Sequence, residues 1–169
     1  IGKSGVIGFV TNAGFLEANT ADGLRKCLVD EFSSLYVFHL RGNARTSGEL
    51  RRKEKDNVFG QGTRTPIAIT LFVKNPNAEK HGQIYFHDIG DYLSQKEKLE
   101  RIADFGSVSG ISEDEAWQAI EPDEYGDWLK QRDDDFSEFV SLGDKKERVE
   151  LSLFNNYSSG IKTILQQRS

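Results

Sequence analysis

The sequence predicts an α/β fold built on a mixed sheet whose later strands pair antiparallel. Short runs rich in branched and aromatic residues alternate with helical periodicity, in the order strand, helix, strand, long loop, strand, strand, helix. The last two predicted strands are separated by only a short turn, which is typical of an antiparallel hairpin. These two observations indicate a partly antiparallel sheet with helices packed on it.

The first three elements are predicted within residues 5–40. Residues 5–10 form an apolar run bounded by glycine, which predicts a buried strand. Residues 20–32 have the periodicity of an amphipathic helix of about three turns, with Arg25 away from its apolar face. That predicted face consists of Leu24, Cys27, Leu28 and Phe32. Residues 35–40, rich in aromatic and branched side chains, predict the second strand.

The elements that follow are separated by a long polar segment. Residues 41–66 contain several glycines and few apolar residues, which predicts a loop without internal structure. Residues 66–73 and 82–87 predict a third and a fourth strand that form a hairpin. Ser94 and Glu97 match a capping box and predict the start of a further helix. Beyond residue 106 the pattern weakens and predicts an irregular segment with short helices.

The composition limits the class of protein. Hydrophobic residues make up 37% of the chain and charged residues 29%, a balance typical of globular proteins. No apolar run approaches the ~20 residues that span a bilayer, so a membrane is not an expected partner. Cys27 is the only cysteine, which excludes an internal disulfide and fits a reducing, cytoplasmic location. The sequence also offers no cluster of metal ligands, so no metal is expected.

The charge is unevenly distributed along the chain. The net charge is −5, yet residues 41–64 carry seven cationic residues against three acidic ones, a local balance of +4. The cationic residues are Arg41, Arg45, Arg51, Arg52, Lys53, Lys55 and Arg64. A basic segment on an acidic chain indicates a surface for an anion, and arginine grips phosphate through two N–H groups at once. A solvated charged linker is the alternative interpretation.

Several motifs resemble one enzyme family. Residues 5–16, GVIGFVTNAGFL, and 58–74, VFGQGTRTPIAITLFVK, look like the rear half of gamma-type N6-adenine DNA methyltransferases. Residues 38–53, FHLRGNARTSGELRRK, 87–93, HDIGDYL, and 126–132, GDWLKQR, are more distinctive. Together these motifs resemble the type ISP restriction–modification enzymes, which fuse a nuclease, a helicase-type motor, a methyltransferase and a target-recognition region.

The resemblance implies how the chain is organised. Residues 1–105 would form the C-terminal half of a methyltransferase domain, a partial Rossmann-like sheet with antiparallel terminal strands. Residues 106–169 would form an irregular connecting segment into the target-recognition region. The chain has no methionine and starts at Ile1, so we expect a piece of a longer protein.

Two motifs of the family do not occur in this sequence. These are the glycine-rich S-adenosylmethionine loop and the catalytic Asn-Pro-Pro-Tyr or -Phe, and the only Asn-Pro here, at Asn75, is predicted to be a turn. The resemblance therefore implies S-adenosylmethionine as the cofactor of the full-length protein, with none expected for this chain alone. It implies no catalytic residue here, and a chain that is inactive without the N-terminal half of the domain.

The resemblance also assigns a base pocket. Phe59 stands where the family has an aromatic that packs on the extruded adenine, and Asn12 and Phe15 follow the first strand at the pocket border. In the same context the seven cationic residues of 41–64 would contact the backbone of duplex DNA without reading its sequence. The alternatives are a core anchor for Phe59 and an ordinary strand-to-helix turn at Asn12.

Two further expectations concern the chain as a whole. An α/β module with one basic loop is also compatible with a stand-alone nucleic-acid-binding or protein-interaction protein without catalysis. Half a sheet leaves a strand edge open, so self-association through that edge is expected as well.

Overall fold

The computed structural model describes residues 2–60, 62–129 and 139–140. Contacts within the chain divide it into two units, residues 1–131 and 132–169. The description below concerns the first unit. The predicted irregular segment beyond position 129 lies outside the described residues, apart from Phe139 and Val140, which are exposed.

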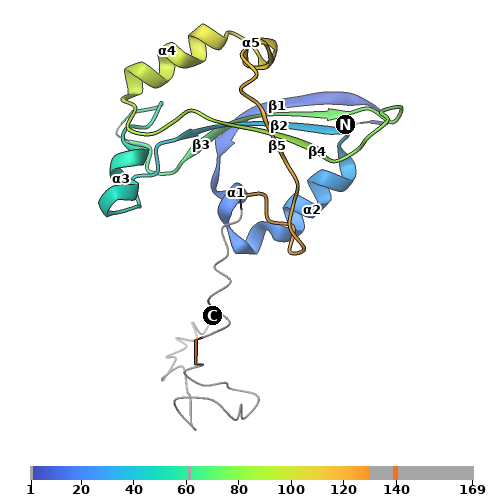
Figure 1. Cartoon of the computed structure of the whole chain (residues 1–169), viewed down its shortest axis with the longest axis horizontal. Coiled ribbons are helices and arrows are strands. Elements are labelled where there is room, and N and C mark those ends of the chain that lie inside the picture. Colours follow the sequence, from blue (N-terminus) through green and yellow to red (C-terminus); the bar gives the residue numbers. More distant parts are fainter. Residues whose placement is uncertain (1, 61, 130–138, 141–169) are drawn as a thin grey trace, which may run out of the picture. The chain divides into compact units, whose positions relative to one another are not determined.

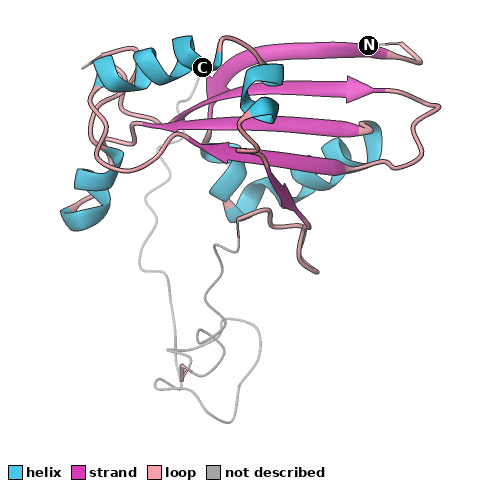
Figure 2. Ribbon diagram, turned by 45° about the horizontal axis from the view of Figure 1, so that its top comes forward, coloured by secondary structure: helices cyan, strands magenta, loops and turns pink. Residues whose placement is uncertain are grey.

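Five strands form one mixed sheet in the order β1-β3-β2-β4-β5 (Figure 2). The strands are β1 (Gly5–Asn12), β2 (Ser34–Arg41), β3 (Ile67–Lys74), β4 (Gln83–Asp88) and β5 (Gln118–Ile120). β3 is antiparallel to β1 and β2, β4 is parallel to β2, and β5 is antiparallel to β4. The predicted mixed α/β sheet is thus confirmed.

The predicted hairpin between the third and fourth strands is wrong. β4 pairs with β2, because the connection 75–82 carries the chain past the start of β2. The backbone N–H of Gly82 donates to Phe32 (2.9 Å), and that of Gln83 donates to Ser33 (3.1 Å). These bonds draw β4 to the far side of β2, where the two strands run in the same direction.

Helices cover both faces of the sheet (Figure 1). One face carries α1 (Gly14–Glu17), the short 3-10 turn η1 (Asn19–Ala21) and α2 (Asp22–Glu31). The other face carries α4 (Gln95–Phe105) and α5 (Val108–Glu113), while α3 (Gly48–Glu54) lies at one end of the sheet. The predicted capping box is present, since the Ser94 hydroxyl accepts from the Glu97 backbone and the Glu97 carboxylate accepts from the Ser94 backbone.

The core has two clusters, one on each face. On the α2 side, Leu35, Val37 and Phe72 pack with Leu16 and Trp128. The α4 and α5 side holds a cluster whose buried members are Phe38, Leu40, Val58, Ile67, Ile89 and Ile111. Residues 106–129 pack on the same sheet through α5, β5 and Trp128, whereas a domain boundary near residue 105 in a longer protein stays a prediction.

Three further expectations need correction. β1 is not a buried strand: its only strand partner in the described part of the chain is β3, and Val6 is 60% exposed. Residues 41–66 are not a loop without structure, because they contain α3. The prediction of which face of α2 is buried is also wrong, since Leu24 and Cys27 are exposed whereas Arg25 is completely buried.

Candidate nucleic-acid interface

The candidate site lies at one end of the sheet, where the carboxyl ends of three strands meet. β1, β2 and β4 run in the same direction and end there at Asn12, Arg41 and Asp88. β3 starts at that end of the sheet with Ile67. In open α/β sheets, ligands bind in the crevice outside the carboxyl ends of the strands. The basic segment joins the end of β2 to the start of β3, so it lies at this end of the sheet.

Phe59 presents an accessible ring. Its side chain is 62% exposed, so it does not serve as a core anchor. The buried Asn57 holds the backbone beneath it. The Asn57 amide donates to the carbonyls of Gly42 (3.2 Å) and Thr65 (2.9 Å), and its oxygen accepts from the Phe59 N–H (3.0 Å). One buried amide therefore fastens the Phe59 turn to both ends of the basic segment.

Gly42 permits this close approach. Its φ is +91°, and a Cβ atom there would stand 2.7 Å from the Asn57 amide nitrogen and 2.9 Å from the Asn57 Cα. Arg41 and Lys55 also have positive φ, 56° and 45°, although neither is glycine. Non-glycine residues with such strained backbone angles cluster at functional sites.

Two of the predicted DNA-backbone cations are paired with carboxylates of the protein. Arg41 donates to Asp88 (Nε to Oδ1, 2.7 Å) and pairs with Asp91 (2.5 Å). Lys53 lies 3.5 Å from the same Asp91 carboxylate. These two residues therefore organise the loop, and their charge is largely balanced. Arg52 is exposed and pairs with Glu49 one helical turn earlier (3.2 Å).

The remaining four cations have no carboxylate partner within 4 Å in the described part of the chain. They are Arg45, Arg51, Lys55 and Arg64. Arg45, Lys55 and Arg64 are exposed, and Arg51 is partly buried. The structure thus separates the predicted cations into a structural pair, one surface ion pair and four that are free for an external anion.

Asp88, at the end of β4, pairs with both His39 and Arg41. Burial alone would raise its pKa, but hydrogen bonds from His39, Arg41 and the Gly90 N–H, together with the charge of Arg41, hold that pKa well below its usual range. The carboxylate thus stays ionised and keeps Arg41 in place throughout the physiological pH range.

A buried ammonium group lies beneath the same loop. Lys98 of α4 is completely buried. It donates to three backbone carbonyl oxygens, those of Leu40 (2.9 Å), Glu54 (3.0 Å) and Asp56 (2.6 Å). Burial lowers the pKa of Lys98 to about 8. The residue ties the end of β2 and both sides of the α3 C-terminus to α4.

Asn12 and Phe15 lie together, in a hollow that Phe59 does not line. The two residues line an apolar depression of about 280 Å³ with side chains from β1, β3 and α2. The Asn12 carboxamide accepts from the Gly14 N–H (2.7 Å), and Phe15 packs edge-on against Trp128. The following residue, Ala13, donates to the Pro66 carbonyl (2.8 Å) and so joins this turn to the start of β3.

A second buried cation holds the Phe15 turn. The Arg25 guanidinium donates to the carbonyls of Phe15 (2.8 Å), Ala18 (2.9 Å) and Gly126 (3.0 Å). It also forms an ion pair with Asp127, and both side chains are completely buried. Gly126 and Asp127, the first two residues of the quoted 126–132 motif, thus hold the turn after β1 through Arg25.

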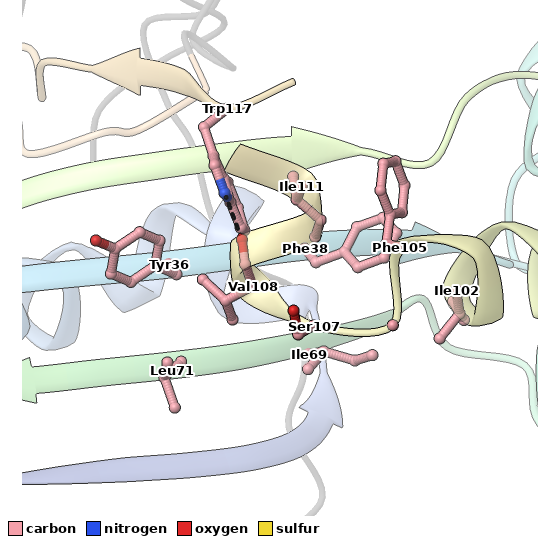
Figure 3. Close-up of a pocket in the computed structure, with 11 residues that line it drawn as sticks. Tyr36, Phe38, Ile69, Leu71, Ile102, Phe105, Ser107, Val108, Ile111 and Trp117 are labelled. Carbon is pink, nitrogen blue, oxygen red and sulfur yellow. Dashed lines mark hydrogen bonds between the residues drawn. The ribbon is translucent and has the colours of Figure 1, made fainter. Parts of the chain in front are cut away.

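An apolar cavity of about 220 Å³ lies elsewhere, between the sheet and α4 and α5 (Figure 3). Tyr36, Phe38 and Phe105 line it, and the Trp117 indole donates to the Val108 carbonyl at 3.4 Å beside it. No charged side chain lines this cavity. It therefore has no means of holding a phosphate and is separate from the candidate interface.

Sequence reasoning missed four residues that shape the interface. Asp88 and Asp91 lie within the quoted motif of residues 87–93, and their closely spaced acidic positions were the available signal. Asn57, directly before the Val58-Phe59 pair, is the scaffold of the Phe59 turn. Lys98 gave no signal, because a lysine on an amphipathic helix is normally exposed.

No helix in the described ranges is long and apolar enough to cross a membrane.

The chain was compared with protein families, curated proteins and solved structures. No protein-family model matches the chain, and a search of curated proteins gives no significant match. Among solved structures, the ATP-dependent type ISP restriction–modification enzyme LlaBIII bound to DNA is similar over 90% of this chain, with 37% identity and a TM-score of 0.79.

Two further structures are similar. A nuclease-deletion mutant of the type ISP enzyme LlaGI, in complex with a DNA substrate mimic, shares 44% identity over 86% of the chain, with a TM-score of 0.74. A complex of DrdV with DNA shares 32% identity over 82% of the chain, with a TM-score of 0.66. The chain spans 10% of the length of the LlaBIII chain and 13% of each of the other two.

Proposed function

We propose a function from one premise: this chain belongs with the type ISP restriction–modification enzymes, of which it matches one segment. In the full-length protein it forms the rear part of a DNA adenine-N6 methyltransferase domain. There it supplies a stacking surface for the extruded base and contacts to the DNA backbone. It does not methylate alone.

The observation that carries this proposal is the exposed Phe59 ring beside free cations. A methyltransferase that acts on a paired base must first extrude it, and stacking on an aromatic ring returns part of that cost. Phe59 projects from a turn braced by Asn57, while Arg51 and Lys55 provide positive charge nearby. The DNA complexes of the similar enzymes support duplex DNA as the ligand.

The chemistry of methyl transfer requires groups from outside this chain. S-adenosylmethionine would supply the methyl group, and its glycine-rich loop is missing from this sequence. The exposed edge of β1 offers hydrogen-bonding groups to a further strand. We assign that strand to the other half of the methyltransferase domain, which also holds the methyl donor. Self-association of this chain through β1 would compete for the same edge.

The first prediction concerns Phe59. Replacement of Phe59 by alanine in the intact enzyme should weaken binding of DNA that carries the recognition site by about 5- to 150-fold, which corresponds to roughly 1–3 kcal/mol of base stacking. Sequencing for N6-methyladenine first identifies the target base. With 2-aminopurine at that position, the fluorescence increase that reports base extrusion should fall with the same variant.

Leu50 provides the matched control. It is an apolar residue of α3 in the same basic segment, and at 63% exposure it is as accessible as Phe59. Leu50→Ala should leave both affinity and fluorescence unchanged. Equal losses in the two variants would show that the loop, and not the Phe59 ring, matters. An enzyme that methylates no adenine would overturn the proposed reaction itself.

The second prediction concerns Arg51 and Arg52. Charge reversal of both to glutamate should weaken DNA binding to a similar degree on all sequences, because phosphate contacts carry no sequence information. The dependence of log Kd on log salt should become less steep by roughly 0.9 for each phosphate that the protein no longer neutralises. Lys80→Glu, on the exposed connection at the opposite edge of the sheet, is the control and should change neither quantity. Weakening confined to one base position would contradict the assignment.

A further inference from the structure

A polar pocket opens directly beside the Phe59 turn. Its volume is about 350 Å³. The side chains that line it include Arg51, Lys55, Asp56, Asn57, Thr63 and Gln95. Asn57 and Gly60, which flank Phe59 in the sequence, both belong to the wall. Whatever occupies this pocket therefore lies beside the turn that carries Phe59.

The wall of the pocket is rich in hydrogen-bond donors. Arg51 uses one guanidinium nitrogen to cap the Lys55 carbonyl, and its other N–H groups have no partner in the described part of the chain. The ammonium group of Lys55 and the hydroxyl of Thr63 make no hydrogen bond to a described residue either. Two cations and a hydroxyl that face one cavity match the acceptors of a phosphate group.

One carboxylate also lines the pocket, but it is already engaged. The Asp56 carboxylate accepts from the Gln95 backbone N–H (3.4 Å) at the start of α4. The Asp56 carbonyl meanwhile accepts from Lys98. These contacts fix Asp56 against α4, and its charge is offset by that of Arg51 and Lys55. The pocket therefore keeps a positive balance.

The shape of the site limits which anion fits. A base stacked on Phe59 remains attached to its own sugar, and the phosphates on either side of that sugar lie only a few covalent bonds away. The pocket is larger than a single phosphate requires and has room for a sugar–phosphate unit. The pocket and the ring are held by the same residue, Asn57, so their spacing is fixed.

We propose that this pocket binds the sugar–phosphate unit adjacent to the extruded nucleotide, with Arg51 and Lys55 contacting its phosphate. The inference rests on the proposed function, because it places a specific phosphate relative to the base on Phe59. It also distinguishes two neighbouring arginines. Arg51 reaches a defined phosphate, whereas Arg52, paired with Glu49 on the outer side of α3, contributes only general charge.

The test combines protein and DNA changes in the intact enzyme. Duplexes with the recognition site carry one uncharged methylphosphonate, moved stepwise along the strand that holds the target adenine. Wild-type protein should bind a duplex about tenfold more weakly when the methylphosphonate stands at one or two positions flanking that adenine. Arg51→Met should reduce that position-specific effect to about threefold, because Lys55 still contacts the same phosphate. Arg52→Met, the control, should preserve the wild-type pattern.

A second variant separates binding from folding. Because Arg51 caps the α3 C-terminus, its replacement can loosen the helix, so Lys55→Met is measured in parallel and should couple to the same phosphate. Uniform weakening at all positions, with the 2-aminopurine signal intact, overturns the pocket assignment while the proposed function stands. An absent 2-aminopurine signal in wild-type protein overturns the proposed function itself, and this inference with it.

Discussion

Arg25→Met is expected to lower the free energy of unfolding by about 3–5 kcal/mol, the range found when one member of a buried ion pair is removed. Arg25 and Asp127 are both completely buried, and the guanidinium also serves three backbone carbonyls. The variant removes one ion-pair partner of a carboxylate that remains in the interior. Urea unfolding followed by circular dichroism measures the change.

The double variant Arg25→Met/Asp127→Leu tests the cause. If the buried charge produces the destabilisation, removal of both charges should recover a large part of the stability. Lys96→Met is the matched control, since Lys96 is an exposed cation paired only with Glu100 one turn away. That substitution should cost less than about 0.5 kcal/mol. A small effect for Arg25→Met would mean that the interior there is open to water.

Lys98→Met is expected to lower the free energy of unfolding by on the order of 3 kcal/mol, because three carbonyl oxygens lose the donor that serves them. It should also weaken DNA binding, since Lys98 fixes the basic segment. Faster amide hydrogen exchange in α3 and at Asn57 would show that the loop has loosened. Unchanged exchange there would contradict the anchoring role.

The pH dependence of stability provides an independent test of the same residue. The pKa of Lys98 is lowered to about 8 from the ordinary value of 10.5. Between these pH values the unfolded chain binds more protons than the folded one, so stability should rise with pH across this window. Other groups titrate there too, so the relevant quantity is the difference between wild type and Lys98→Met. That difference should favour wild type more at pH 10 than at pH 8.

The fold followed from apolar runs, but the strand pairing did not. Runs such as residues 35–40 indicate a strand because branched and aromatic side chains suit a half-buried sheet. Their partners depend on the path of the connections, and a short turn after Asn75 favours a hairpin. The connection instead bonds to Phe32 and Ser33 and so places β4 beside β2. That tertiary choice is not encoded in the local pattern.

The consequences of this pairing explain what was missed at the interface. In the parallel register of β2 and β4, His39 stands opposite Asp88, which brings Asp88 next to Arg41. Arg41 was assigned to phosphate contact because it belongs to the basic segment, and the local sequence does not show that Asp88 lies beside it. Motif context assigned Phe59 to a base pocket, whereas residue type alone favours a core position for phenylalanine, and the structure shows the residue exposed.

Helical periodicity failed at two decisive positions for one reason. It assigns apolar residues to the interior and charged residues to solvent, yet Arg25 and Lys98 are among the most buried side chains of α2 and α4. A buried charge is tolerated only when hydrogen-bond partners surround it. Several of those partners, such as Gly126 for Arg25 and Glu54 for Lys98, lie far along the chain, so the helical pattern alone does not reveal them.

The two buried cations, Arg25 and Lys98, also affect which substitutions the protein tolerates during evolution. Six of their seven acceptors are backbone carbonyl oxygens, which every amino acid possesses. Substitution of the side chains around the interface therefore leaves these acceptors in place. Relatives can alter which groups meet an external ligand while they retain the shape of the loops, provided that one arginine and one lysine persist. Variation should accordingly concentrate at Arg45 and Arg64 and spare Arg25 and Lys98.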